Sequence, residues 1–222
     1  MRNMYVIKFA KNGYMKYISH LDTVRLFRNT FKIAGVELAY SQGFNPHPKM
    51  SFAQPLPLGY SSTCEIIEFE TVEDIEPGAI IDAMNAVIPK GIALINCERL
   101  KTGGSFAARL TAAEYEISMP YDPTRARDIG ELCGGFLKQS RIPVEKRQKK
   151  TGQKKEIDIK SMIRSFSFAL TDDKIILLAT LDAGSVSNLS PELLIPAFVS
   201  FSGIEIAREE IDVNRSGLFF AE

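Results

Sequence analysis

The sequence predicts an α+β fold of two tandem ferredoxin-like units, each with the element order β-α-β-β-α-β and an antiparallel sheet. Two observations support this prediction. Some segments alternate apolar and polar residues, as strands do, and in others the apolar residues recur at helical spacing. The two kinds of segment alternate along the chain. The same order of elements then runs a second time after a glycine-rich joint at 102–105. The expected units therefore span residues 1–102 and 103–222.

The first unit opens with an alternating, aromatic and β-branched strand at Met4–Lys11, and Tyr14–Ser19 offers an extension of that pattern. Ser19 and Asp22 then form an acidic variant of the capping box, which predicts a helix that runs to Gly35. The other elements expected here are strands at Glu37–Gln42, Cys64–Val72 and Gly91–Lys101 and a helix at Glu76–Pro89. We expect both helices on one face of the sheet.

The second unit repeats the order of elements without repeating the residues. The expected strands are Glu114–Met119, Val144–Gln148, Glu156–Ala169, Lys174–Leu181 and Glu205–Val213, and the expected helices are Thr124–Gln139 and Pro191–Phe201. Gly134 and Gly135 interrupt the first of these helices, which indicates close packing or a kink.

Composition and cysteine spacing exclude several classes of protein. Hydrophobic residues make up 45% and charged residues 24%, as in soluble globular proteins, and no run reaches the roughly 18 apolar residues of a membrane span. With no signal-peptide pattern at the start, we expect a cytoplasmic location. Cys64, Cys97 and Cys133 are far apart and form no CxxC pair, so we expect inert thiols, no metal and no cofactor in this chain.

Positive charge is concentrated in one segment, although the formal net charge of the chain is zero. Between Arg141 and Lys160, eight Lys or Arg stand against three Asp or Glu. This segment predicts a hairpin that contacts a phosphate backbone, and a solvated hairpin that only aids solubility is the alternative. The predicted phosphate contacts are Arg141, Lys146, Arg147, Lys149, Lys150, Lys154 and Lys155, with Arg25 and Arg28 of the first helix extending the cationic surface.

A proline-rich loop, Gln42–Lys49, separates two well-patterned segments of the first unit. Its prolines restrict the backbone, and its polar side chains are left to contact a ligand. Phe44, next to a glycine, is a candidate for stacking on an unpaired base. The residues predicted to recognise a base, a backbone feature or a partner protein are Gln42, Phe44, Asn45, His47 and Lys49.

The only two histidines, His20 and His47, permit an alternative catalytic interpretation. A histidine pair can cleave a phosphodiester by acid–base catalysis, with Lys49 stabilising the developing charge. The simpler interpretation is that His20 assists the helix cap and His47 fills a turn. A metal site formed with Asp22 fits poorly, because the usual ligand spacings are absent. No P-loop, dinucleotide-binding, nucleophile-elbow or zinc-protease motif occurs in the chain.

Two stretches resemble a known family. "YISHLDTVRLFRNTFKIAGVELAYSQGFNPHPKMSFAQPLPLGYSSTCEIIEFE" and "PVEKRQKKTGQKKEIDIKSMI" are similar to the radical SAM-linked protein family, a bacterial domain of unknown function found alone or fused behind radical SAM proteins. The resemblance implies a radical SAM enzyme as partner. That partner would carry the iron–sulfur cluster and S-adenosylmethionine.

The combined prediction is a non-catalytic module that binds RNA or presents a substrate to a radical SAM enzyme, in tRNA or rRNA modification or processing. Two alternatives remain open. One is a metal-independent endoribonuclease like those that process CRISPR repeats, with His20, His47 and Lys49 at its site. The other is a protein-interaction module whose loop binds the radical SAM partner without RNA.

Overall fold

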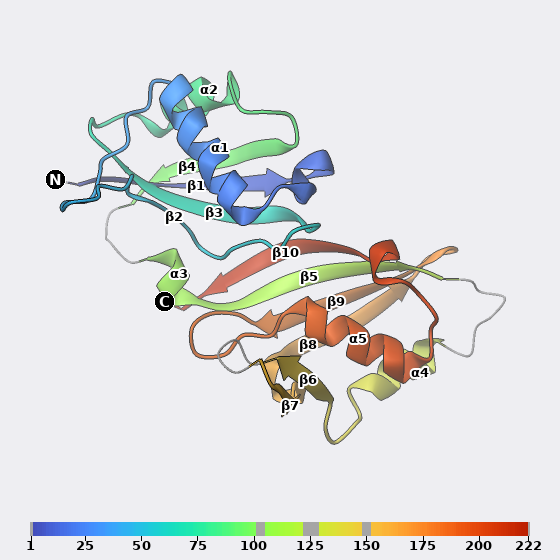
Figure 1. Cartoon of the computed structure of the whole chain (residues 1–222). Coiled ribbons are helices and arrows are strands. Elements are labelled where there is room, and N and C mark those ends of the chain that lie inside the picture. Colours follow the sequence, from blue (N-terminus) through green and yellow to red (C-terminus); the bar gives the residue numbers. More distant parts are fainter. Residues whose placement is uncertain (1, 101–104, 122–128, 148–151, 222) are drawn as a thin grey trace. The chain divides into compact units, whose positions relative to one another are not determined.

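The computed structural model of the chain describes residues 2–100, 105–121, 129–147 and 152–221 (Figure 1). Contacts divide the chain into two compact units: unit 1 comprises residues 1–110 and 215–222, and unit 2 comprises residues 111–214. The fold is mixed α+β with mostly antiparallel strand pairs, which confirms the predicted class. The boundary predicted between residues 102 and 103 lies outside the described residues.

Unit 1 is an antiparallel sheet in the order β4-β1-β3, with the short strand β2 paired to the outer edge of β3. Its last segment, Arg215–Phe220, comes from strand β10, which neighbours β3. Its elements are β1 (Asn3–Lys11), η1 (Gly13–Tyr17), α1 (His20–Ile33), β2 (Met50–Phe52), β3 (Ser61–Thr71), α2 (Pro77–Asn85), β4 (Ile92–Arg99) and α3 (Phe106–Arg109).

Both long helices of unit 1 pack on the same face of the sheet, as predicted (Figure 1). Alternate residues of β1 point to that face and are almost fully buried, as expected for a half-buried strand. They meet apolar side chains from one stripe of each helix. The buried cluster includes Tyr5, Ile7 and Phe9 of β1, Phe27 and Phe31 of α1, Ile67 and Phe69 of β3, and Ile80 and Met84 of α2.

Two segments of unit 1 differ from the prediction. Residues 13–17 form the 3₁₀ helix η1 instead of extending the first strand. The segment Glu37–Gln42 makes only isolated bridges, Leu38 with Thr71 and Tyr40 with Pro48, so it is not a strand. A chain reversal explains the second difference, because the Ser41 N–H donates to the His47 carbonyl and the Lys49 N–H to the Ala39 carbonyl.

In unit 2, β9 lies between β5 and β8, with antiparallel pairing on both sides. A separate two-stranded hairpin, β6–β7, carries the basic segment. The elements are β5 (Leu110–Pro120), α4 (Ile129–Phe136), β6 (Pro143–Arg147), β7 (Lys154–Asp158), η3 (Lys160–Met162), β8 (Ile163–Leu170), β9 (Lys174–Asp182), α5 (Pro191–Ser202), η4 (Arg208–Glu210) and β10 (Asp212–Phe220).

The predicted strand Glu156–Ala169 is wrong in one respect, because η3 breaks it into β7 and β8. The last strand begins at Asp212, later than predicted. The glycine pair lies within α4, where a Cβ on Gly135 would stand 3.4 Å from Cζ of Phe201 in α5, whereas a Cβ on Gly134 would meet nothing within 4 Å. The predicted close packing therefore holds for Gly135 and not for Gly134. Within the described ranges, no helix is both long enough and apolar enough to cross a membrane.

Candidate nucleic-acid interface

The basic segment forms a hairpin, as predicted, and its register decides which cations have partners. Residues that stand opposite each other in an antiparallel pair point to the same face. In β6–β7, Lys146 is opposite Lys155, and Arg147 is opposite Lys154. One face of the hairpin therefore carries Lys146 and Lys155, and farther from the turn it carries Val144 and Ile157. We call this face the lysine face.

The opposite face of the hairpin is electrically balanced. The Lys154 ammonium lies 2.7 Å from the Glu145 carboxylate, which raises the pKa of Lys154. Arg141 lies 3.3 Å from Glu156. The Arg147 side chain donates to the Gly152 carbonyl at 3.1 Å. These cations therefore have acceptors within the hairpin.

The lysine face has no such compensation. Lys146 and Lys155 are exposed, and among the described residues neither makes an ion pair. Like charges directly opposite each other destabilise a strand pair. An anion bound between them would relieve this repulsion. Lys149 and Lys150 were also predicted to contact phosphate, and they lie outside the described residues.

Arg25 and Arg28 lie on the exposed face of α1, in unit 1. The Arg25 guanidinium lies 3.0 Å from Asp22, which is itself held by the Ser19 cap. Hydrogen bonds from Ser19 and from Arg25 keep the pKa of Asp22 below its usual value. The predicted cap is thus confirmed, and Arg25 is partly neutralised by it.

The proline-rich loop is closed at its base and exposed at its tip. Besides the Tyr40–Pro48 bridge, the Ser41 hydroxyl accepts a bond from the His47 N–H at 3.0 Å. Beyond this base the chain from Gln42 to His47 is exposed, and Phe44 protrudes fully into solvent. Among the described residues, no side-chain hydrogen bond involves Gln42, Asn45 or His47.

The side chains of Lys49 and His20 contact residues outside the loop tip. The Lys49 ammonium makes two bonds of 2.9 and 3.0 Å to the Glu70 carboxylate. His20, in the first turn of α1, packs edge-on against Phe52 with ring centroids 5.3 Å apart. Burial lowers the pKa of His20, and the nearby Lys11 and Arg215 charges lower it further against the opposing effect of Glu65. His20, His47 and Lys49, the residues of the alternative catalytic interpretation, thus have separate environments.

A buried ionic cluster adjoins His20. Arg215 is bound through both guanidinium edges, to the Glu65 carboxylate at 2.9 and 2.6 Å and to the Gln54 side-chain oxygen at 2.8 Å. Lys11, on the core side of β1, donates to the Ile18 carbonyl at 3.0 Å. Burial lowers the pKa of Lys11, although Glu65 opposes this. We call Lys11, Gln54, Glu65 and Arg215 the Arg215 cluster.

The three cysteines are free thiols in separate places. Burial raises the pKa of Cys97 to about 12 and that of Cys133 to about 11, and it also raises that of Cys64. Thiols with a pKa raised in this way are poor nucleophiles near pH 7. Among the described residues, no group of three or more His, Cys, Asp or Glu side chains is placed to hold a metal ion.

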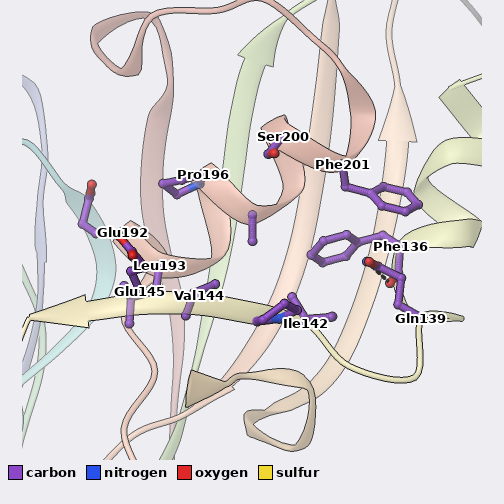
Figure 2. Close-up of a pocket in the computed structure, with 12 residues that line it drawn as sticks. Phe136, Gln139, Ile142, Val144, Glu145, Glu192, Leu193, Pro196, Ser200 and Phe201 are labelled. Atoms are coloured by element: carbon purple, nitrogen blue, oxygen red, sulfur yellow. Dashed lines mark hydrogen bonds between the residues drawn. The ribbon is translucent and has the colours of Figure 1, made fainter. Parts of the chain in front are cut away.

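Unit 2 has a pocket of about 470 Å³ between α5 and the hairpin strand β6 (Figure 2). Phe136, Phe201 and Gln139 lie at one end, and Glu192 and Glu145 lie at the other. The floor is formed by side chains of β6 and of the residue before it, and α5 covers it from the other side. The further lining residues are Ile142, Pro143, Val144, Leu193, Pro196, Ala197 and Ser200.

Comparison with known proteins gives a family. Residues 4–191 match the model of the family described as "Uncharacterized protein conserved in bacteria (DUF2344)". The chain belongs to this family. No curated protein matches it. Among solved structures, that of an unknown protein from Galdieria sulphuraria is similar over 100% of both chains at 12% identity, with a TM-score of 0.28. A TM-score this low does not establish a common fold.

Sequence reasoning missed several exposed aromatic and buried polar residues of this DUF2344 chain. Tyr14 and Tyr17 of η1 are 92% and 62% exposed, and the Lys16 ammonium lies 5.3 Å from the Tyr17 ring centre. A strand extension would have placed one of these rings in the core. The burial of Lys11 had a local signal, because it continues the core-facing alternation of Tyr5, Ile7 and Phe9. No sequence pattern indicated the pocket between α5 and β6.

Proposed function

We propose that this chain is a non-catalytic RNA-binding module whose main phosphate contact is the lysine face of the β6–β7 hairpin. The observation that carries the proposal is the contrast between the two faces. The cations on the other face of the hairpin have acceptors within the hairpin. Lys146 and Lys155 stand opposite each other, and among the described residues neither has an acidic partner. A polyanion supplies the missing charge and releases its counterions on binding.

The loop and the first helix supply a second contact in this proposal. Phe44 presents a free ring for stacking on an unpaired base, and Gln42, Asn45 and His47 present polar groups beside it. Arg25 and Arg28 add charge on α1. Lys49 holds the loop to β3 through Glu70 and acts in this scheme as a positioning residue.

The proposed context is an accessory role beside a radical SAM enzyme in tRNA or rRNA modification or processing. Sequence resemblance supports this part. We also infer ferredoxin-like organisation in each unit. In unit 1 the order β4-β1-β3-β2 with helices after β1 and β3 supports it. In unit 2 the order β5-β9-β8 with α4 after β5 and α5 after β9 supports it.

A salt titration of tRNA binding tests the proposal. For the unaltered chain, the logarithm of affinity should fall linearly with the logarithm of salt concentration. The double variant Lys146→Ala/Lys155→Ala should flatten that slope by about 1.4 to 1.8, since each phosphate contact contributes about 0.7 to 0.9. The matched control is Arg141→Ala/Lys154→Ala, which removes the same charge from the balanced face and should flatten the slope less.

Three outcomes would contradict the proposal. Absent or salt-insensitive RNA binding would remove its basis. RNA cleavage that His47→Ala abolishes would favour the endoribonuclease alternative. Co-purification with a radical SAM enzyme that survives nuclease treatment, without RNA binding by the chain itself, would favour the protein-interaction alternative.

A further inference from the structure

We infer that the pocket between α5 and β6 binds an unpaired nucleobase that carries an exocyclic amino group, within an RNA strand whose phosphates lie on the lysine face. This inference rests on the proposed function and adds to it the part of the RNA that is recognised. The pocket, at about 470 Å³, falls within the size range of small-ligand sites. It has room for a base and its ribose.

The position of the pocket links it to the lysine face. Val144 lines the pocket and lies on the lysine face of β6. Lys146 follows two residues later on the same side of the strand, roughly 6.6 Å farther along it. A lysine at that distance can hold the phosphate of a nucleotide whose base enters the pocket. One strand of the hairpin therefore contributes both a wall of the pocket and a cation.

The walls of the pocket suit a flat, apolar ring. Phe201 stands half-buried at one end, and the fully buried Phe136 ring packs edge-on against it with a centroid distance of 5.5 Å. The Pro196 ring and the Ala197 methyl group come from the middle of α5. Ala197 leaves space where a larger side chain would fill the pocket. Bases of single strands stack on aromatic side chains of this kind.

The polar groups of the pocket are mostly acceptors. The Gln139 amide N–H₂ donates one of its two hydrogens to the Phe136 carbonyl at 2.9 Å, and its amide oxygen and second N–H remain for a ligand. Glu145 and Glu192 lie at the other end, and each is already bonded to a cation, Lys154 and Arg208 respectively. A carboxylate has about four lone-pair sites, so Glu145 retains acceptor capacity with its charge balanced. Acceptors at this end favour bases with an exocyclic amino group, which are adenine, cytosine and guanine, over uracil, which has none.

Binding of fluorescently labelled single strands by the full chain tests this inference. Three RNAs of equal length are compared: all-adenine, all-uracil, and a strand with abasic residues. We expect the adenine strand to bind at least tenfold more tightly than the other two. Ala197→Trp should fill the pocket and reduce adenine-strand affinity to that of the abasic strand. Ser200→Trp, at the exposed rim, is the second filling variant should the first fail to fold.

The matched control is Val186→Trp, which adds the same side chain at a fully exposed position of unit 2. It should keep the adenine preference, and thermal unfolding should confirm that all variants are folded. Equal, salt-dependent binding of all three strands by the unaltered chain would overturn the inference and leave the proposed function standing. An adenine preference that persists in both Ala197→Trp and Ser200→Trp would also overturn the inference and leave the proposed function standing. Absence of binding to any strand would overturn both.

Discussion

Arg215 and Glu65 form a bidentate ion pair, with bonds of 2.9 and 2.6 Å, although 150 positions separate them in the sequence. Their side chains are 0% and 4% exposed. The pair joins the C-terminal segment to β3 within unit 1, next to the buried ammonium of Lys11. Two cations and one carboxylate thus share this interior site, and the effects of removing them should be unequal.

Glu65→Leu should be among the most destabilising single changes in the chain. It leaves Arg215 and Lys11 buried without a carboxylate, and breaking a buried pair costs about 3 to 5 kcal/mol of unfolding free energy. Arg215→Met should cost less, because Lys11 remains to balance Glu65. Urea unfolding of the full chain measures both. Lys154→Met, which breaks an exposed pair, is the control and should have no measurable effect. Equal costs for Glu65→Leu and this control would refute the role of the cluster.

The lowered pKa of His20 predicts a dependence of stability on pH. The unfolded chain binds a proton at His20 below its ordinary pKa of 6.5, whereas the folded chain does so only at lower pH. Unfolding free energy should therefore fall as pH drops below about 6.5, until the folded pKa is passed. Burial is the main cause of the lowered pKa of His20, the Lys11 and Arg215 charges lower it further, and Glu65 opposes them.

The measurement is chemical unfolding of the full chain between pH 5 and 8, a range in which the carboxylates with lowered pKa values do not titrate. His20→Gln should flatten the profile. His47→Gln removes the other imidazole from the exposed loop and should leave the profile unchanged. A profile that His47→Gln flattens and His20→Gln does not would contradict the prediction.

Local patterns predicted most of the elements, because burial of alternate residues such as Tyr5, Ile7 and Phe9 follows from the strand period itself. The exceptions depend on contacts that no local pattern carries. Residues 215–222 join unit 1 through contacts such as the Arg215–Glu65 pair. The segment Glu37–Gln42 has strand-like composition, but the chain reverses beyond it and leaves only isolated bridges.

The sequence predicted that the candidate site is basic, but it did not predict which of the cations have partners. A count of cations predicted the hairpin, but only its register shows that Lys146 meets Lys155 while Lys154 reaches Glu145. A shift of one residue would place Lys146 opposite Lys154 or Glu156 and exchange the faces. Likewise, the Lys49–Glu70 pair requires the β2–β3 pairing, which brings together residues 21 positions apart.

Phe44 and Phe52 should separate binding from stability. Phe44 is fully exposed at the loop tip, so Phe44→Ala should weaken binding of single-stranded RNA about tenfold and leave the melting temperature unchanged. Phe52 packs against Phe9, Phe27 and His20, so Phe52→Ala should cost about 3 kcal/mol of unfolding free energy. Anisotropy titrations and thermal melts of both variants make the comparison. Unchanged RNA affinity in Phe44→Ala would exclude a stacking role.

Lys146→Glu should strengthen the hairpin and abolish binding at the same time. The change replaces the repulsion with Lys155 by an attraction across the strand pair. Amide hydrogen exchange in β6 and β7 should therefore slow, while affinity for RNA falls more than in Lys146→Ala. A residue kept for stability would show the reverse, since its replacement would loosen the hairpin.

Asp158→Lys provides the charge-reversal control on the balanced face, at the end of β7. It removes the acceptor of the Ile142 and Lys160 N–H groups and adds a cation to the balanced face, so hydrogen exchange should accelerate while RNA affinity is kept or increased. The two variants thus have opposite expected signs for both quantities, which an overall change in folding would not produce. If Lys146→Glu instead accelerates exchange, or leaves RNA affinity intact, the lysine face is not an anion site. The opposed lysines would then be a destabilising feature of the hairpin for which phosphate binding gives no reason.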